Sequence, residues 1–127
     1  MRRVFVVCLA AFSLVACAGL QPSARGIDWD GVWSGMGDQA GVTYPVEITI
    51  SGSTHAIDYP TIPCGGTLTL VNDAGDRREL DESITGDCFD RGRVVLVRSG
   101  DQMSFEWFYQ PGDQTPGVTS TLTLSGR

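Results

Sequence analysis

The feature that most constrains this chain is an alternation of apolar and polar side chains, with a period of two, that recurs in short segments after residue 20. Residues 42–50 show it most clearly, with apolar or aromatic side chains at Val42, Tyr44, Val46, Ile48 and Ile50. Successive side chains of a strand point to opposite faces, so the pattern predicts strands that bury one face. No segment after residue 20 keeps a helical apolar period over ten residues. The sequence therefore predicts an all-β fold.

Short segments of this kind fill most of the chain, and turn-forming residues separate most of them, as at 72–76 and 99–102. The predicted strands are residues 28–36, 42–50, 55–59, 66–71, 77–85, 94–98, 103–109 and 118–125. Consecutive strands joined by short turns form an antiparallel meander, and eight strands can close on themselves and remove their edges. We therefore predict a small eight-stranded antiparallel up-and-down barrel, whose interior holds side chains or one small ligand. An open β-sandwich of the same strands is the alternative.

The first residues show a different pattern. Arg2 and Arg3 precede an apolar run over residues 4–15 that only Ser13 interrupts. A helix that spans a bilayer needs about 20 apolar residues. This run is too short for such a helix and has the length of the apolar core of a signal peptide.

The apolar run ends in Leu14-Val15-Ala16-Cys17, which resembles the lipobox of bacterial lipoproteins. In that family the signal peptide is removed before the Cys, which is acylated on its sulfur and on its new amino group. The resemblance implies that Cys17 anchors the protein to a membrane through lipid. The alternative is an ordinary secretory signal with a chance Cys, and both interpretations place the domain outside the cytoplasm.

This motif also predicts the organisation of the chain. Residues 1–16 form the signal peptide, residues 17–27 a lipidated tether and residues 28–127 the β-barrel domain. In Gram-negative lipoproteins an Asp after the Cys favours the inner membrane. Ala18 stands there, so the resemblance implies an outer-membrane anchor with the domain facing the periplasm.

The cysteines indicate one structural disulfide. Of the four Cys residues, Cys8 lies in the predicted signal peptide and Cys17 in the lipobox, which leaves Cys64 and Cys88. In an oxidising compartment an even pair is expected to form a disulfide. The bridge closes a loop of about 25 residues and contributes about 3 kcal/mol in the chain-entropy model. A metal site or a redox pair is the weaker alternative, because there is no CxxC spacing.

Charge and composition exclude several functions. The formal net charge is −6 and the pI about 4.5, so nucleic acid is a poor partner. The chain has no Lys, which excludes Lys nucleophiles, Schiff bases and the P-loop. Its one His, His55, has no Ser or Cys motif to complete a hydrolytic triad and is expected at the surface or at a strand edge. The scattered acids do not fit a calcium loop, so we expect no metal. Without a catalytic motif, we also expect no cofactor and no enzymatic activity.

Glu82 is an acid at a position that the alternation assigns to the interior. It shares its parity with Leu80 and Ile84. A buried carboxylate requires a partner, and Arg78, of the same parity, or an Arg of a neighbouring strand is expected to supply it. The first interpretation is structural: either a core salt bridge or a register shift that leaves Glu82 exposed. A ligand-orienting acid in a barrel cavity is the functional interpretation.

Most aromatic residues share the inward parity, and they either fill the core or line a pocket for an apolar or planar ligand at an open end of the barrel. They are Trp29, Trp33, Tyr44, Tyr59, Phe105, Trp107 and Tyr109. The candidate ligand-binding residues are Trp33, Tyr44, Glu82, Trp107 and Tyr109. Phe108 has the opposite parity and Phe89 an uncertain one, so both are candidates for exposed contacts.

Two further patterns resemble known groups. Gly31-Val32-Trp33 resembles the Gly-x-Trp that opens lipocalin and avidin-type barrels, where the Trp plugs the closed end. A longer pattern is similar to small extracytoplasmic bacterial domains that occur as lipoproteins or attached to membrane-bound signalling proteins. It comprises Trp29-x-Gly31-x-Trp33-x-Gly35, Asp58-Tyr59-Pro60, Cys64-Gly65-Gly66-x-Leu68-x-Leu70, Glu82-x-Ile84-x-Gly86 and Cys88. The second resemblance implies a fold and a location but no activity.

These observations together predict a lipid-anchored, non-enzymatic binding module for a small apolar molecule or a cell-envelope component. One alternative is a protein-binding lipoprotein, such as an inhibitor of a lysozyme or a protease, because an acidic surface speeds encounter with a cationic lysozyme. A purely structural envelope lipoprotein is the other alternative. Polar groups inside a cavity favour the small molecule, whereas a protruding loop at Phe89 or at residues 111–117 favours the protein partner.

Overall fold

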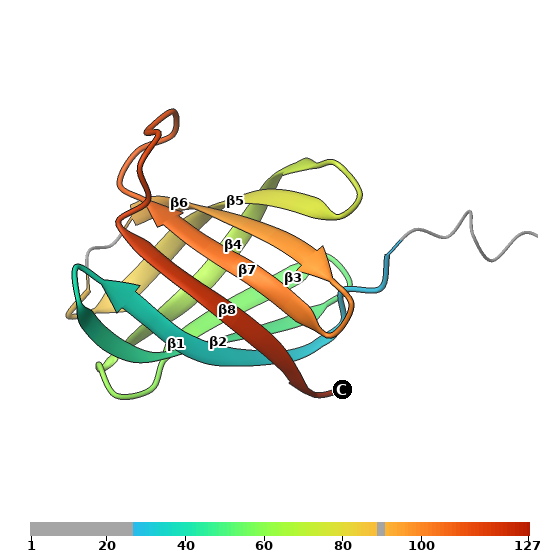
Figure 1. Cartoon of the computed structure of the whole chain (residues 1–127), viewed down its shortest axis with the longest axis horizontal. Helices are drawn as coiled ribbons and strands as arrows, with labels where there is room; N and C mark the ends of the chain where they lie inside the picture. Colours follow the sequence, from blue (N-terminus) through green and yellow to red (C-terminus); the bar gives the residue numbers. More distant parts are fainter. Residues whose placement is uncertain (1–26, 89–90) are drawn as a thin grey trace, which may run out of the picture.

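The computed structural model describes residues 27–88 and 91–127, and this part of the chain forms eight antiparallel strands and no helix. The strands are β1 (Gly31–Gln39), β2 (Val42–Ser51), β3 (Thr54–Tyr59), β4 (Cys64–Asp73), β5 (Arg77–Gly86), β6 (Arg91–Ser99), β7 (Gln102–Phe108) and β8 (Val118–Gly126). Each strand pairs with the next, and β8 returns to pair with β1, so the barrel is closed (Figure 1). The predicted up-and-down barrel is confirmed, and the open sandwich is excluded.

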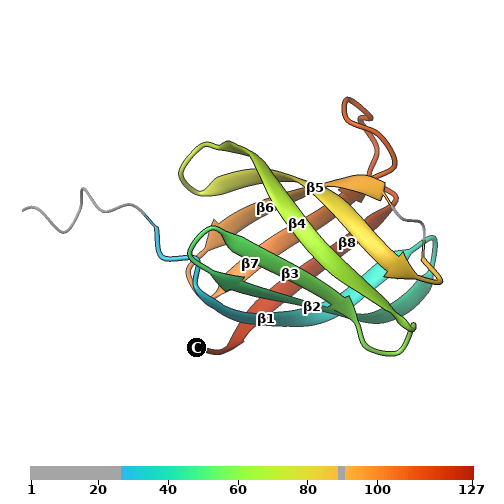
Figure 2. The ribbon, with the colours of Figure 1, turned by 180° about the vertical axis from the view of Figure 1, so that it is seen from behind.

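The two ends of the barrel differ, and we call them the mouth and the base. The mouth is the end at which β1, β3, β5 and β7 finish, and it lies on the left in Figure 1. The base is the opposite end, where β2, β4, β6 and β8 finish. The described chain enters the barrel at the base and also ends there (Figure 2). At this end the Arg127 guanidinium donates to the Asp28 carboxylate at 2.6 Å.

The first strand begins later than predicted, at Gly31 rather than at residue 28. The Asp28 carboxylate accepts a hydrogen bond from the Asp30 N–H at 3.0 Å, which turns the chain before the strand starts. Trp29 therefore lies outside the strand, but its side chain is still only 3% exposed. The interior position predicted for this ring is correct, although Trp29 lies in the turn before the strand rather than in the strand.

The inward side chains of the strands form one core. In β2 the alternation buries Val46, Ile48 and Ile50. The same alternation predicts Val42 on the inner face, but 65% of its surface is exposed. It pairs with Gln39 beside the β1–β2 turn, where the hairpin extends past the core, so the interior prediction for Val42 is wrong.

The base is filled by aromatic rings and arginines. The Trp33 side chain is fully buried, and its indole Nε1 donates to the Trp29 carbonyl at 3.0 Å. The Arg98 guanidinium lies 4.8 Å from the centre of the Trp33 ring, and the Arg78 guanidinium 4.5 Å from that of Trp29. Such cation–π contacts combine packing with charge stabilisation. Trp33 is thus part of the filled base of the barrel.

The His55 side chain also lies inside the base, with 1% of its surface exposed. The expectation of a surface or edge histidine is therefore wrong. Its Nε2 accepts a hydrogen bond from Arg78 at 2.9 Å, so the neutral ring carries its proton on Nδ1, which donates to the Ser53 carbonyl at 3.1 Å. Burial lowers the pKa of His55, and the Arg78 charge lowers it further against the effect of the Ser53 bond. The ring is therefore held in the neutral form.

The predicted disulfide between Cys64 and Cys88 is present, with the two Cα atoms 5.9 Å apart. It ties the start of β4 to the segment after β5, so it braces one side of the mouth. The lipobox with Cys17 and the candidate contact residue Phe89 lie outside the described residues.

Candidate functional site

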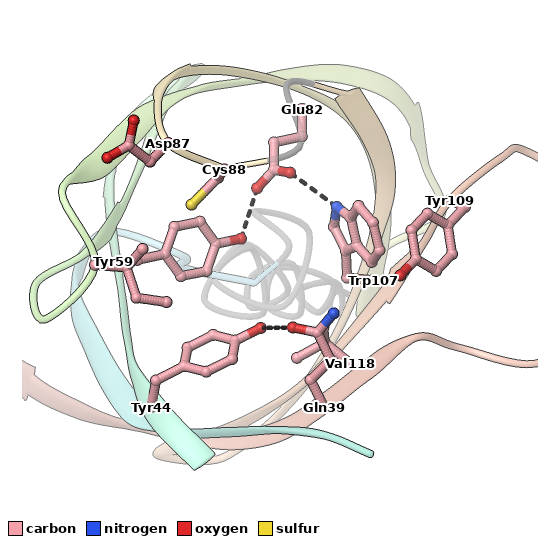
Figure 3. A pocket seen from close by; sticks show the side chains of 10 residues that line it. Gln39, Tyr44, Tyr59, Glu82, Asp87, Cys88, Trp107, Tyr109 and Val118 are labelled. Carbon is pink, nitrogen blue, oxygen red and sulfur yellow. Dashed lines mark hydrogen bonds between the residues drawn. The ribbon is translucent and has the colours of Figure 1, made fainter. Parts of the chain in front are cut away.

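A cavity of about 260 Å³ lies at the mouth of the barrel (Figure 3). Its lining comes from both sides of the barrel and comprises Gln39, Tyr44, Tyr59, Ile62, Glu82, Asp87, Cys88, Trp107, Tyr109 and Val118. Four of the five predicted ligand-binding residues, Tyr44, Glu82, Trp107 and Tyr109, therefore meet at one site. Trp33 does not, because it is fully buried at the base.

Glu82 is the central polar group of this cavity. It points inward between Leu80 and Ile84, as the alternation predicts, and 5% of its surface is exposed. Its Oε2 accepts a hydrogen bond from the Tyr59 hydroxyl at 2.7 Å, and its Oε1 accepts one from the Trp107 indole at 2.8 Å (Figure 3). Both carboxylate oxygens are thus held by aromatic side chains from other strands.

The predicted arginine partner of Glu82 is wrong, and so is the predicted exposure by a register shift. Arg78 donates to His55 and lies 3.4 Å from the Asp73 carboxylate, all at the base. Arg78 and Glu82 are four positions apart, which along a strand is about 13 Å. The two side chains share a face of β5 but lie at opposite ends of the barrel.

Burial raises the pKa of the Glu82 carboxyl, and the hydrogen bonds from Tyr59 and Trp107 offset only part of that rise. Burial also raises the pKa of Tyr59, and the neighbouring Glu82 charge raises it further. The same two causes, burial first, raise the pKa of Tyr44. The site therefore disfavours additional negative charge and keeps both hydroxyls protonated.

The aromatic walls of the cavity are two edge-to-face pairs. The rings of Tyr44 and Tyr59 lie 5.9 Å apart at 69°, and those of Trp107 and Tyr109 lie 4.5 Å apart at 71°. Figure 3 shows the Tyr59 ring and the Trp107 ring on either side of Glu82. Tyr109 lies just past the end of β7, and with 50% exposure it forms part of the rim rather than the core. This geometry is common for packed rings and leaves the space between the two pairs to the cavity.

Six of the ten lining residues were absent from the predicted ligand-binding set, and two of them form side-chain hydrogen bonds with residues of that set. Tyr59 holds Glu82, and its inward parity was a sufficient signal for that position. Gln39 accepts a hydrogen bond from the Tyr44 hydroxyl at 3.0 Å, on the side of the cavity away from Glu82 (Figure 3). No local pattern marks Gln39, because its partner is brought to it by the β1–β2 hairpin.

Glycines allow the Trp107 ring to reach Glu82. Gly92 is paired with Glu82 across β5 and β6, and a Cβ atom there would lie 2.1 Å from the Trp107 Nε1. A Cβ atom at Gly117 would lie 3.2 Å from the same ring. The indole therefore packs directly against the backbone, and a strand glycine often marks such an approach. Gly92 is a positioning residue for the bond between Trp107 and Glu82.

Comparisons and local features add few functional constraints. Within residues 27–88 and 91–127, no three His, Cys, Asp or Glu side chains are grouped as metal ligands. In the same ranges, no helix has the length and apolar character needed to cross a membrane. Comparisons with protein-family models, curated proteins and solved structures found no significant match to this chain. One fold hosts many functions, so the residues of the site carry the functional information.

Proposed function

We propose that this protein is a non-enzymatic binding module that holds a small molecule in the mouth cavity. One observation carries the proposal: a buried carboxylate, Glu82, is kept in place by Tyr59 and Trp107 beside a cavity at the end of the barrel. Burying an acid costs free energy, and this acid borders a cavity in which a ligand could reach it. The only His of the chain lies at the base, away from the cavity, which supports binding rather than acid–base catalysis.

The size of the cavity supports a small ligand. Its volume of about 260 Å³ lies just below the range of roughly 300–1,000 Å³ typical of pockets for drug-sized molecules. At about 30 Å³ per water molecule, it corresponds to roughly nine waters. A single ring with a short side chain is the size of ligand that this volume favours.

The proposed location is the cell envelope, with a lipid anchor at Cys17 and the domain in the periplasm. The support is the lipobox, Leu14-Val15-Ala16-Cys17. The described chain enters the barrel at the base, so a tether would attach at the end away from the cavity (Figure 1). The Cys17→Ser variant is expected to move from the membrane to the soluble fraction. Lipid attachment that persists in this variant would contradict the anchor.

Native mass spectrometry of the protein, extracted gently from its own envelope, tests the binding function. We expect a small non-covalent adduct on the wild-type chain and its loss from Glu82→Gln. The matched control is Glu47→Gln, which makes the same change on the outer face of β2 and is expected to keep the adduct. An adduct that survives in Glu82→Gln, or no adduct on any chain, would count against tight binding in this cavity.

A protein partner is the second candidate, and the β7–β8 connection favours it. Residues 109–115 are all exposed, and Figure 1 shows this loop standing away from the barrel beside the mouth. Asp113 stabilises the turn of this loop, because its carboxylate accepts a hydrogen bond from the Gln110 N–H at 3.1 Å. If the loop docks on a lysozyme or a protease, the protein should inhibit that enzyme, and replacing residues 111–115 with glycine and serine should abolish inhibition. Undiminished inhibition by that variant would reject the loop as the docking site.

A further inference from the structure

The mouth cavity is acidic, and the described residues give its central acid no counter-charge. Among the described residues that line it, the charged side chains are Glu82 and Asp87. Arg93 of the neighbouring strand pairs with Asp81 at 2.9 Å on the outer face of the barrel. In the described part of the chain, Glu82 accepts its two hydrogen bonds from neutral groups and forms no ion pair. The cavity therefore contains a buried acid that a cation could neutralise.

Glu82 retains capacity to bind a donor. An ionised carboxylate offers about four acceptor positions, and Tyr59 and Trp107 occupy one on each oxygen. Because Glu82 lines the cavity, a donor group placed in the cavity can reach the remaining positions. A positive donor would also supply the missing counter-charge, which makes a charge-assisted hydrogen bond stronger than a neutral one.

The aromatic walls favour the same kind of ligand. The rings of Tyr44, Tyr59, Trp107 and Tyr109 border the cavity, and aromatic faces attract cations through their quadrupole. The base of the barrel shows this chemistry within the chain, where Arg78 and Arg98 lie over Trp29 and Trp33. At the mouth, aromatic rings again lie beside a charged group, the Glu82 carboxylate. Unlike at the base, no cation of the described residues pairs with it.

We infer that the ligand of the mouth cavity is a small organic cation, with an ammonium group that bonds to Glu82 and an apolar body that packs against the aromatic walls. This inference rests on the proposed binding function and specifies its ligand class. An anion would meet Glu82 and Asp87, and like charges at close range repel. A wholly apolar ligand would remove water from Glu82 without offering it a donor, which costs free energy.

Three probes with the same ring and similar size test the charge preference. They are 2-phenylethylammonium, 2-phenylethanol and phenylacetate, titrated into the full-length protein while the indole N–H resonance of Trp107 is followed by NMR. The Trp107→Phe variant assigns that resonance among the three Trp residues. We expect the cation to bind about tenfold more tightly than the alcohol, a difference of about 1.4 kcal/mol. Phenylacetate is expected to give no saturable shift.

The variants locate the effect at Glu82. The Glu82→Gln variant should lose about tenfold in affinity for the cation and keep its affinity for the alcohol, because the amide preserves shape and removes charge. The Glu47→Gln control should keep both affinities. The order of the three probes is measured on the wild-type chain, so the test does not depend on the folding of any variant.

The outcomes separate the inference from the proposed function. If the alcohol or phenylacetate binds most tightly and shifts Trp107, the cation inference is overturned while binding at the mouth stands. If the cation binds equally to wild-type and Glu82→Gln chains, the role of Glu82 is overturned. If none of the probes gives a saturable shift at millimolar concentration, both the inference and the binding function are rejected.

Discussion

The base and the mouth of the barrel are built from similar side chains but treat buried charge differently. At the base, Arg78 and Arg98 lie over tryptophan rings, and His55 completes the network inside the protein. At the mouth, Glu82 is held by two neutral aromatic donors beside a cavity of about 260 Å³. The arginines of the base have partners within the chain, whereas the described residues give the acid of the mouth no counter-charge. Aromatic residues of the same inward parity thus fill the core at one end and border a cavity at the other.

The largest expected effect compares the two tryptophans. Trp33→Ala should lower the free energy of unfolding by about 3–5 kcal/mol, because it opens a void in a filled core. Trp107→Ala should cost less, about 1–3 kcal/mol, because the ring already borders a cavity and the main loss is a donor to Glu82. Urea unfolding of both variants measures the difference. Equal losses would show that the mouth is packed as the base is.

The next effect concerns the disulfide, which braces the mouth only. Replacing Cys64 and Cys88 together with Ser should lower the free energy of unfolding by about 3 kcal/mol, since the bridge restricts the unfolded chain. Hydrogen exchange should quicken first at the start of β4 and the end of β5, both at the mouth. A reductant provides the control, because it should weaken the wild type and leave the double variant unchanged. Faster hydrogen exchange at the base instead would show that the disulfide does not stabilise the mouth in particular.

The smallest effects are in the pH dependence of stability. At the base, His55 should make the protein less stable as the pH falls. Its pKa is lowered in the folded state, chiefly by burial, with Arg78 adding to and Ser53 and Asp73 opposing that effect. As the pH falls below about 6.5, the unfolded chain takes up the proton first, so stability falls. The His55→Gln variant should lose that part of the pH dependence in urea unfolding between neutral and mildly acidic pH.

At the mouth, Glu82 predicts the opposite sign. Its pKa is raised by burial, while the groups that face it, Tyr59 and Trp107, lower it through hydrogen bonds; Tyr44 and Asp87 line the same cavity. As the pH rises above about 4.5, the unfolded chain ionises first, so stability falls until the folded carboxyl also ionises. The Glu82→Gln variant should remove this loss. If the stability of Glu82→Gln fell more steeply with rising pH than that of the wild type, Glu82 would not be the group responsible for the loss.

The strand pattern was predictable because alternation is a local property. Eight strands and a closed antiparallel order result from short periodic segments and short turns. The inward position of Glu82 has the same origin in parity. His55 shares the parity of Ile57 and Tyr59, so its burial was also readable, and a prediction from residue type alone is wrong there because parity decides the face.

The sequence by itself determined which face of each strand turns inward and which cysteines pair, because both depend on local alternation and on a simple count; it did not determine where the buried face ends, as Val42 shows. Only the tertiary structure decided the end of the barrel at which each inward residue lies and which partner it meets. Arg78 and Glu82 share one face of β5, but the length of the strand separates them, and closure of the barrel brings Tyr59 and Trp107 to Glu82. Contacts across the barrel depend on register and closure, which no single segment encodes.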